Sequence, residues 1–133
     1  MKKITIPYKQ HYIQADFYGD FSDLNKITLL MAHGLGGEKQ CGLADFAESY
    51  HALDLNVCVF DHRGFGESTG SVKCLVDKTS QLEDWQSVIH YLKDELNIST
   101  KNIILWGYSY SGGHVITLAS QTTFKAVISN FPH

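Results

Sequence analysis

Residues 104–120, "ILWGYSYSGGHVITLAS", lead from an apolar run through a glycine, an aromatic residue and a serine into a second apolar pattern. The run is typical of a strand buried on both faces, and the pattern after it is typical of a helix. A sharp turn between such a strand and helix exposes a serine hydroxyl and holds it at a fixed angle. The stretch therefore predicts an α/β architecture with a candidate nucleophile at the turn.

The same alternation continues along the chain on both sides. Apolar runs predict buried strands at 27–32, 57–61, 102–107 and 125–131, and helical spacing predicts helices at 42–55, at 79–96 and from 111 onward. Segments 3–7 and 11–19 predict an antiparallel ribbon, with Pro7 ending its first strand because proline cannot donate to a ladder. This order is typical of a mostly parallel, twisted sheet with helices on both faces and right-handed crossovers.

Two helices carry more detailed signals. Ser80 and Glu83 have the spacing of a capping box at the start of segment 79–96. The apolar residues of segment 42–55 follow helical spacing, which predicts one buried face. That face is expected to consist of Leu43, Phe46, Ala47, Tyr50 and Leu53.

Composition narrows the function classes. The chain is 44% hydrophobic and 19% charged with a net charge of −3, which is typical of a soluble globular protein. No lysine and arginine cluster is present, so nucleic acid and anionic membranes are not expected as partners. The longest apolar run is far too short to span a bilayer, and the first residues do not have the pattern of a signal peptide.

The three cysteines, Cys41, Cys58 and Cys74, are widely spaced and form no C-x-x-C motif. This spacing argues against a disulfide framework or a zinc site. Reduced cysteines favour a cytoplasmic location. The histidines show no H-x-x-x-H or H-E-x-x-H spacing, so no metal and no cofactor are expected.

The serine turn has small residues where crowding demands them. Gly107 and Ser111 lie two positions before and after Ser109, which gives G-x-S-x-S. A register with Ser111 as the nucleophile is the alternative, but its strand would overrun the turn, so Ser109 is favoured. We expect a positive φ at Ser109. The backbone N–H groups of Tyr110 and of Leu35, in the glycine-rich segment "AHGLGG", are the candidate oxyanion donors.

Three glycine-bearing turns, "HGLGG", "DHRGFGES" and "GYSYSGG", follow predicted strands in this order. Together they resemble the α/β-hydrolase superfamily, in particular its serine esterase, X-Pro dipeptidyl-peptidase and dienelactone-hydrolase branches. The resemblance covers nearly the whole chain. It implies a small acyl substrate, a nucleophile at Ser109, oxyanion donors at Leu35 and Tyr110, and structural roles for Asp61, Arg63 and Gly66.

The histidines and tyrosines near these turns have competing interpretations. His33 is expected to hydrogen-bond locally and hold its loop rather than act as a base. His114 lies one turn into the helix after Ser109 and is expected to point away from the position of a base. Asp61 and His62 are adjacent at a strand end, so their side chains are expected to point apart. Tyr108 and Tyr110 either line a pocket or pack beside it.

The chain departs from the family pattern after the serine. The resemblance implies the order serine, acid, histidine, yet no carboxylate follows Ser109 and, with His114 set aside, only the terminal His133 could titrate as a base. Residues 1–133 are therefore interpreted as the N-terminal part of one α/β-hydrolase domain, truncated after the family's sixth strand. A shortened gene product, a proteolytic fragment and half of a split protein all fit.

Two functions follow from this interpretation. The first is a serine hydrolase acting on ester, thioester or amide bonds, inactive until a missing C-terminal half supplies the acid and histidine. The second is a non-catalytic α/β module that acts in binding or assembly. Segment 125–131 would be an unpaired apolar edge, which favours self-association.

Overall fold

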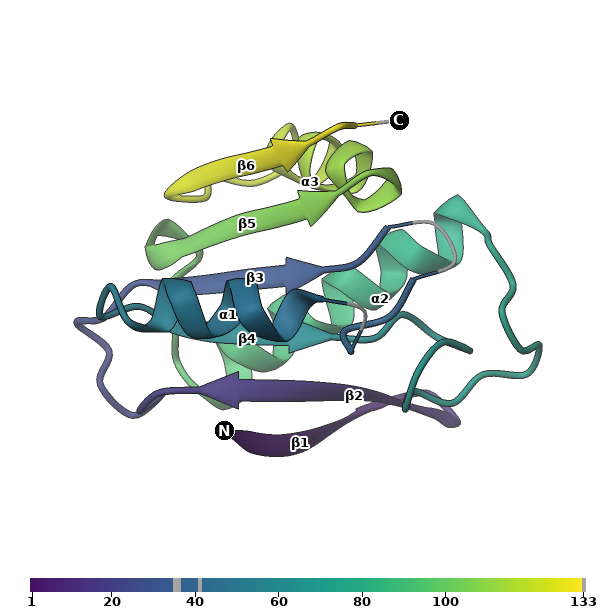
Figure 1. Ribbon diagram of the computed structural model, residues 1–133, viewed down its shortest axis with the longest axis horizontal. Helices are drawn as coiled ribbons and strands as arrows, with labels where there is room; N and C mark the ends of the chain where they lie inside the picture. Colours follow the sequence, from purple (N-terminus) through teal and green to yellow (C-terminus); the bar gives the residue numbers. More distant parts are fainter. Residues whose placement is uncertain (35–36, 41, 133) are drawn as a thin grey trace.

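The computed structural model describes residues 1–34, 37–40 and 42–132, and a mixed β-sheet organises it (Figure 1). Within the described residues the sheet has six strands in the order β1-β2-β4-β3-β5-β6. Strands β3, β4, β5 and β6 are parallel, and the β1–β2 ribbon is antiparallel and pairs with β4. The strands are β1 (Lys2–Tyr8), β2 (His11–Tyr18), β3 (Thr28–Ala32), β4 (Asn56–Phe60), β5 (Ile103–Tyr108) and β6 (Ala126–Asn130).

Helices cover both faces of the sheet. Helix α1 (Leu43–His51) lies on one face, and α2 (Lys78–His90) and α3 (Tyr110–Ala119) lie on the other (Figure 1). Helix α2 runs into a π-helical turn, η1 (Tyr91–Glu95), and a short 3-10 helix, η2 (Thr100–Asn102), precedes β5. The sheet, the ribbon and the two-sided helical cover confirm the predicted fold class.

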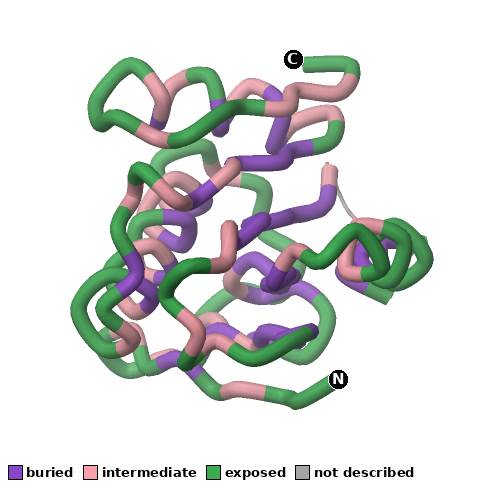
Figure 2. The backbone as a smooth tube through the Cα atoms, turned by 90° about the vertical axis from the view of Figure 1, so that its left-hand side faces the viewer, coloured by how far each residue is buried: buried purple, intermediate pink, exposed green. Residues whose placement is uncertain are grey.

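The core has two layers because the central strands are buried on both faces. Every residue of β3 and β4 is buried, as Figure 2 shows for the centre of the molecule. Leu30 of β3 packs toward α2 and α3, where Trp85 is fully buried, while Leu29 and Met31 pack toward α1. This explains why these strands are apolar throughout rather than alternating.

Three local predictions are wrong. Strand β1 continues through Pro7 to Tyr8, which is possible because β1 is an edge strand and needs no donor on its outer side. Helix α2 begins earlier than expected, and Asp77, not Ser80, is its cap: its carboxylate accepts hydrogen bonds from the backbone N–H and hydroxyl of Ser80. The carboxylate also suits the positive end of the helix dipole.

The predicted buried face of α1 is only partly correct. Leu43 and Ala47 are buried, but Phe46 is 53% exposed and Leu53 is 71% exposed. Helix α1 ends at His51, so Leu53 lies beyond it. Among the described residues, no helix has the length and apolarity needed to cross a membrane.

Candidate active site

Ser109 occupies the turn between β5 and α3 in a conformation that L-residues rarely adopt. Its φ is 56° and its ψ is −113°, and it directly precedes the first residue of α3. The positive φ confirms the expectation from the sequence. Backbone strain of this kind persists only where the surroundings enforce it, and it is common where a side chain must be presented for chemistry.

The surroundings of Ser109 explain the glycine two positions before it. A β-carbon at Gly107 would overlap the carbonyl oxygen of Ser111 and would lie 2.9 Å from the amide nitrogen of Gly112. The backbone N–H of Ser109 donates to the carbonyl oxygen of Asn130, 2.7 Å away at the end of β6. The turn is thus held between its own helix and the neighbouring strand.

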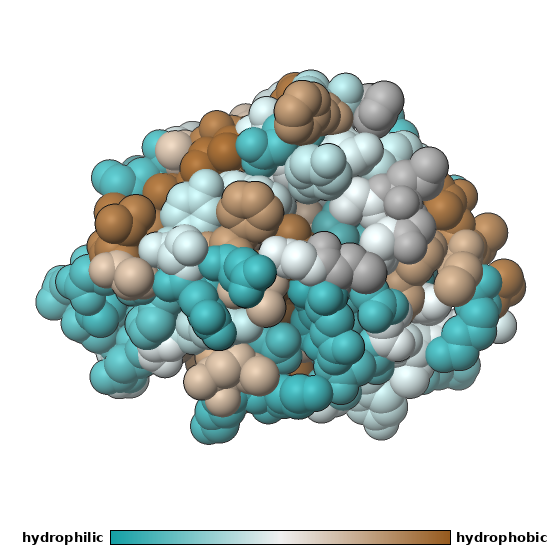
Figure 3. Space-filling model, viewed as in Figure 1, coloured by the Kyte–Doolittle hydropathy of each residue, from teal (hydrophilic) through white to brown (hydrophobic). Residues whose placement is uncertain are grey.

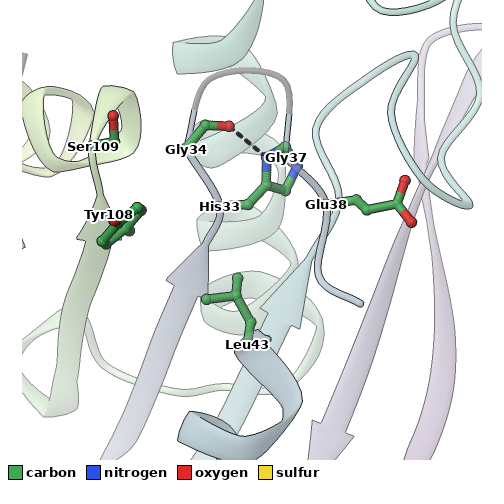
Figure 4. Close-up of a pocket in the computed structure, with 7 residues that line it drawn as sticks. All are labelled: His33, Gly34, Gly37, Glu38, Leu43, Tyr108 and Ser109. Atoms are coloured by element: carbon green, nitrogen blue, oxygen red, sulfur yellow. Dashed lines mark hydrogen bonds between the residues drawn. The ribbon is translucent and has the colours of Figure 1, made fainter. Parts of the chain in front are cut away.

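A cavity of about 210 Å³ lies beside this turn, at the carboxyl end of the parallel strands. Figure 4 shows Ser109 and Tyr108 on one side of it and the loop after β3 on the other. Gly34 comes close enough that a β-carbon there would lie 2.8 Å from the β-carbon of Ser109. The residues that line the cavity are His33, Gly34, Gly37, Glu38, Leu43, Tyr108 and Ser109.

The structure describes only one of the two predicted oxyanion donors, Tyr110. Leu35 lies outside the described residues. Tyr110 is the first residue of α3, so its backbone N–H has no acceptor within the helix. Its ring packs edge-on against His114, with 4.7 Å between the centroids, whereas Tyr108 is the tyrosine that lines the cavity.

His33 is engaged in local hydrogen bonds, as expected. Its Nδ1 lies 2.9 Å from the carbonyl oxygen of Gly34, and its Nε2 accepts the backbone N–H of His62 at 3.2 Å. Burial lowers the pKa of His33, which keeps the ring neutral. With both ring nitrogens occupied, His33 cannot accept the proton of the Ser109 hydroxyl.

A buried contact between a serine and a histidine lies beneath the turn, and no spacing in the sequence indicates it. The hydroxyl of Ser111 lies 3.0 Å from Nε2 of His62, and Nδ1 of His62 lies 3.6 Å from the carboxylate of Asp84. All three side chains are completely buried, so no substrate can reach the hydroxyl. Burial lowers the pKa of His62 well below its usual value and therefore favours the neutral ring.

Asp84 connects this cluster to the loop after β4. Its carboxylate accepts the backbone N–H of Arg63 at 2.8 Å and pairs with the guanidinium at 2.9 Å. Burial raises the pKa of Asp84 to about 6 although Arg63 acts in the opposite direction. Asp61 and His62 point apart: the Asp61 carboxylate accepts the backbone N–H groups of Lys39 and Glu67, at 2.7 and 3.0 Å.

None of the remaining described histidines hydrogen-bonds to the Ser109 hydroxyl. His114 is 1% exposed, and neither ring nitrogen has a hydrogen-bond partner among the described residues. His11 contacts Ser71, His51 contacts the carbonyl oxygen of Leu55, and His90 pairs with Asp94. His133 lies outside the described residues. Within the described part of the chain, no hydrogen bond joins a histidine to the Ser109 hydroxyl, and no cluster of metal-ligating side chains occurs.

Residues 27–131 match the family model described as "alpha/beta hydrolase fold". The chain belongs to the α/β hydrolase fold family. It is 43% identical over 119 residues to the quorum-quenching protein AidA of Acinetobacter baumannii, covering 89% of this chain and 39% of that protein. It is 34% identical over 97 residues to the thiohydrolase aneE of Aspergillus aculeatus, covering 73% of this chain and 30% of that protein.

Solved α/β hydrolases share the fold. Est1E of Butyrivibrio proteoclasticus, solved with bound ferulic acid, superposes with a TM-score of 0.83 at 20% identity, covering 97% of this chain and 52% of that one. The α/β hydrolase GrgF of Penicillium gives a TM-score of 0.82 at 21% identity, covering 95% and 44%. The chain thus spans about half or less of the length of each of these four proteins.

Proposed function

We propose that this chain carries the nucleophile-bearing part of a serine hydrolase that cleaves ester or thioester bonds. The observation that carries the proposal is Ser109, which stands at φ 56° between β5 and α3 and lines a cavity beside Gly34. In this role the Ser109 hydroxyl attacks the acyl carbon, and the tetrahedral intermediate places negative charge on the former carbonyl oxygen. The backbone N–H groups of Tyr110 and Leu35 are the proposed donors to that oxygen.

The substrate class follows from the family and from one relative. The match to the α/β hydrolase fold supports a hydrolase, and the relative aneE is named a thiohydrolase, which favours ester or thioester bonds. A thioester or an activated ester has a good leaving group, so the first step makes little demand on a general acid. We therefore place ester and thioester bonds before amide bonds in the proposed substrate range.

The general base and its carboxylate are proposed to come from outside the described residues. His33 and His62 have their side chains in other hydrogen bonds, and His114 is buried away from the cavity. The relatives that match this chain are more than twice as long, which leaves room for both groups. Without a base, the chain is expected to become acylated at Ser109 but not to turn over.

A binding or assembly role is the second candidate, and the outer edge of β6 favours it. β6 is the last strand of the described sheet, Val127 is 36% exposed and Phe131 is 76% exposed. Figure 3 shows hydrophobic side chains along this edge, above β5. An open edge of this kind pairs with another strand, either from a longer form of the protein or from a second copy.

Acylation by an activated short-chain ester and by a thioester of the same acyl group separates the two candidates. The hydrolase proposal predicts a mass increase of one acyl group per chain, lost in Ser109→Ala, with turnover near background. Turnover per chain that rises with protein concentration would mean that a second copy supplies the base. If Ser109 gains no acyl group from either reagent, the hydrolase proposal is wrong and the assembly role remains.

A further inference from the structure

Lys39, in the loop between β3 and α1, is a buried cation surrounded by carboxylates. The residue is only 2% exposed. Its Nζ lies 3.7 Å from Asp16 of β2 and 3.5 Å from Asp61 after β4, and it forms an ion pair with Glu67. Lysine is almost never buried without such partners, because burial penalises an unpaired charge heavily.

The carboxylates hold both the side chain and the backbone of this loop. Oδ1 of Asp61 accepts the backbone N–H of Lys39 at 2.7 Å, so this one carboxylate contacts the backbone and the ammonium of the same residue. Burial alone would lower the pKa of Lys39, but Glu67, Asp61 and Asp16 raise it overall, so the ammonium stays charged.

Glu67 is itself held in place. Lys3 of β1 pairs with its second oxygen at 2.8 Å, and the hydrogen bonds from Lys3 and Lys39 lower the pKa of Glu67 to about 2. Asp61 accepts the backbone N–H of Glu67. The cluster thus joins the loop after β3 to the β1–β2 ribbon and to the loop after β4, which are far apart in the sequence.

The loop that Lys39 holds forms one wall of the Ser109 cavity. Gly37 and Glu38 line the cavity and directly precede Lys39. The backbone N–H of Gly37 donates to the carbonyl oxygen of Gly34 at 3.1 Å, and Gly34 packs against Ser109. A continuous series of short contacts therefore leads from the ammonium of Lys39 to the Ser109 turn.

We propose that Lys39 is a positioning residue, whose buried ammonium fixes the Gly37–Glu38 wall of the cavity next to Ser109 through Asp16, Asp61 and Glu67. The effect on acylation rests on the proposed function, whereas the effect on the loop does not. Lys39 touches no reacting atom, so it acts only through the geometry of the wall. A displacement of about 1 Å in such a wall is enough to lower a reaction rate on the order of 100-fold.

Lys39→Met tests this proposal, with Lys26→Met as the matched control. Methionine replaces the unbranched stem of lysine up to Cε and removes only the charged ammonium. Lys26 pairs with the exposed Asp54 at 2.9 Å, at the opposite end of β3. The first measurement is amide hydrogen exchange on the whole chain. We expect faster exchange at residues 37–40 and at Glu67 in Lys39→Met, with unchanged exchange in β5, and no such change in Lys26→Met.

The second measurement is the rate constant and the saturation constant for acylation of Ser109 by an activated ester. We expect the rate constant of Lys39→Met to fall on the order of 10- to 100-fold, with a smaller change in the saturation constant. In Lys39→Met the carboxylate of Glu67 loses the ammonium with which it pairs. The double variant Lys39→Met/Glu67→Gln removes that carboxylate charge as well, so it should be more stable in urea than Lys39→Met while its acylation stays slow.

Three results would overturn the proposal. Exchange at residues 37–40 that stays at the wild-type rate would show that Lys39 does not hold the wall. Exchange that rises equally in every strand would show a general loss of stability instead. If acylation recovers together with stability in the double variant, the slow acylation of Lys39→Met is also due to a general loss of stability. If the wild-type chain is never acylated, the proposed function fails, and the exchange measurement alone decides the role of Lys39.

Discussion

The hydroxyl oxygen of Ser111 lies 3.0 Å from Nε2 of His62, and both side chains are fully buried beneath the turn that carries Ser109. With Asp84 on the far side of the imidazole, these residues have the composition of a catalytic triad. They lack access to solvent and to the cavity, so they can only tie α3 to the end of β4. Two serines that are two positions apart therefore have different roles. Ser109 lines the cavity, whereas Ser111 forms a buried structural contact with His62.

Ser111→Ala is expected to lower stability without affecting Ser109. The substitution leaves Nε2 of His62 buried without its partner, and such a loss costs about 1–3 kcal/mol. Urea denaturation measures the loss, and acylation by an activated ester measures Ser109. A variant that keeps its stability but loses acylation would make Ser111 the nucleophile instead.

Ser109→Gly is expected to stabilise the chain relative to Ser109→Ala. Both variants remove the hydroxyl, but only glycine adopts a φ of 56° and a ψ of −113° without strain. The difference should be about 1–3 kcal/mol in the free energy of unfolding, measured in urea. As a control, Ser87→Gly in the middle of α2 should destabilise, because glycine is unfavourable inside a helix. Equal stabilities for the two Ser109 variants would mean that the turn is not strained.

Gly107→Ala is expected to disrupt the turn. The new methyl group would overlap the backbone of Ser111, which cannot move without displacing α3. Overpacking of this kind costs about 1–3 kcal/mol or more. Gly37→Ala is the control, because a β-carbon there meets its neighbours at an ordinary 3.5 Å. Comparable urea midpoints for both variants would contradict the packing around Ser109.

The pH dependence of stability contains a contribution from His114. Burial, followed by the charges of His62 and Lys78, lowers the pKa of His114 from 6.5 to about 4. Between pH 6.5 and about 4, His114 is therefore protonated in the unfolded chain but neutral in the folded chain. Protonation then stabilises the unfolded chain, so the free energy of unfolding is highest above pH 6.5 and decreases as the pH falls toward 4. The loss amounts to about 2–3 kcal/mol.

His114→Phe should remove this contribution, since phenylalanine fills similar space and the ring nitrogens have no partners among the described residues. Urea denaturation at about pH 7 and about pH 4.5 is expected to show a smaller loss on acidification in the variant, by about 2–3 kcal/mol. An identical loss in both proteins would show that His114 titrates normally.

Much of the fold is predictable because its signals are local. The apolar runs of β3, β4 and β5 and the G-x-S-x-S turn are complete within a few residues each, and the structure has them where the sequence indicates. Errors arise where two local signals compete. Asp77 and Ser80 are both good caps, and the helix takes the one that begins it a turn earlier.

The clusters that support the site are not visible in the sequence. Nothing in the sequence distinguishes Lys39 from the other lysines. Its partner Asp16 belongs to β2 and its partner Asp61 follows β4, and these strands become neighbours only in the folded sheet. The contact between His62 and Ser111 likewise joins residues 49 positions apart. Spacing along one segment carries no information about such pairs. The adjacency of Asp61 and His62 showed only that they point in different directions.

Covalent labelling with a fluorophosphonate decides whether Ser109 is the nucleophile that the turn presents. The reagent phosphonylates an accessible serine with loss of fluoride, slowly where no described histidine accepts the hydroxyl proton, as at Ser109, and peptide mass analysis after a long incubation locates the adduct. We predict one adduct per chain at Ser109, absent from Ser109→Ala and present in Ser111→Ala. Labelling at Ser111, or equal labelling of wild type and Ser109→Ala, would contradict it.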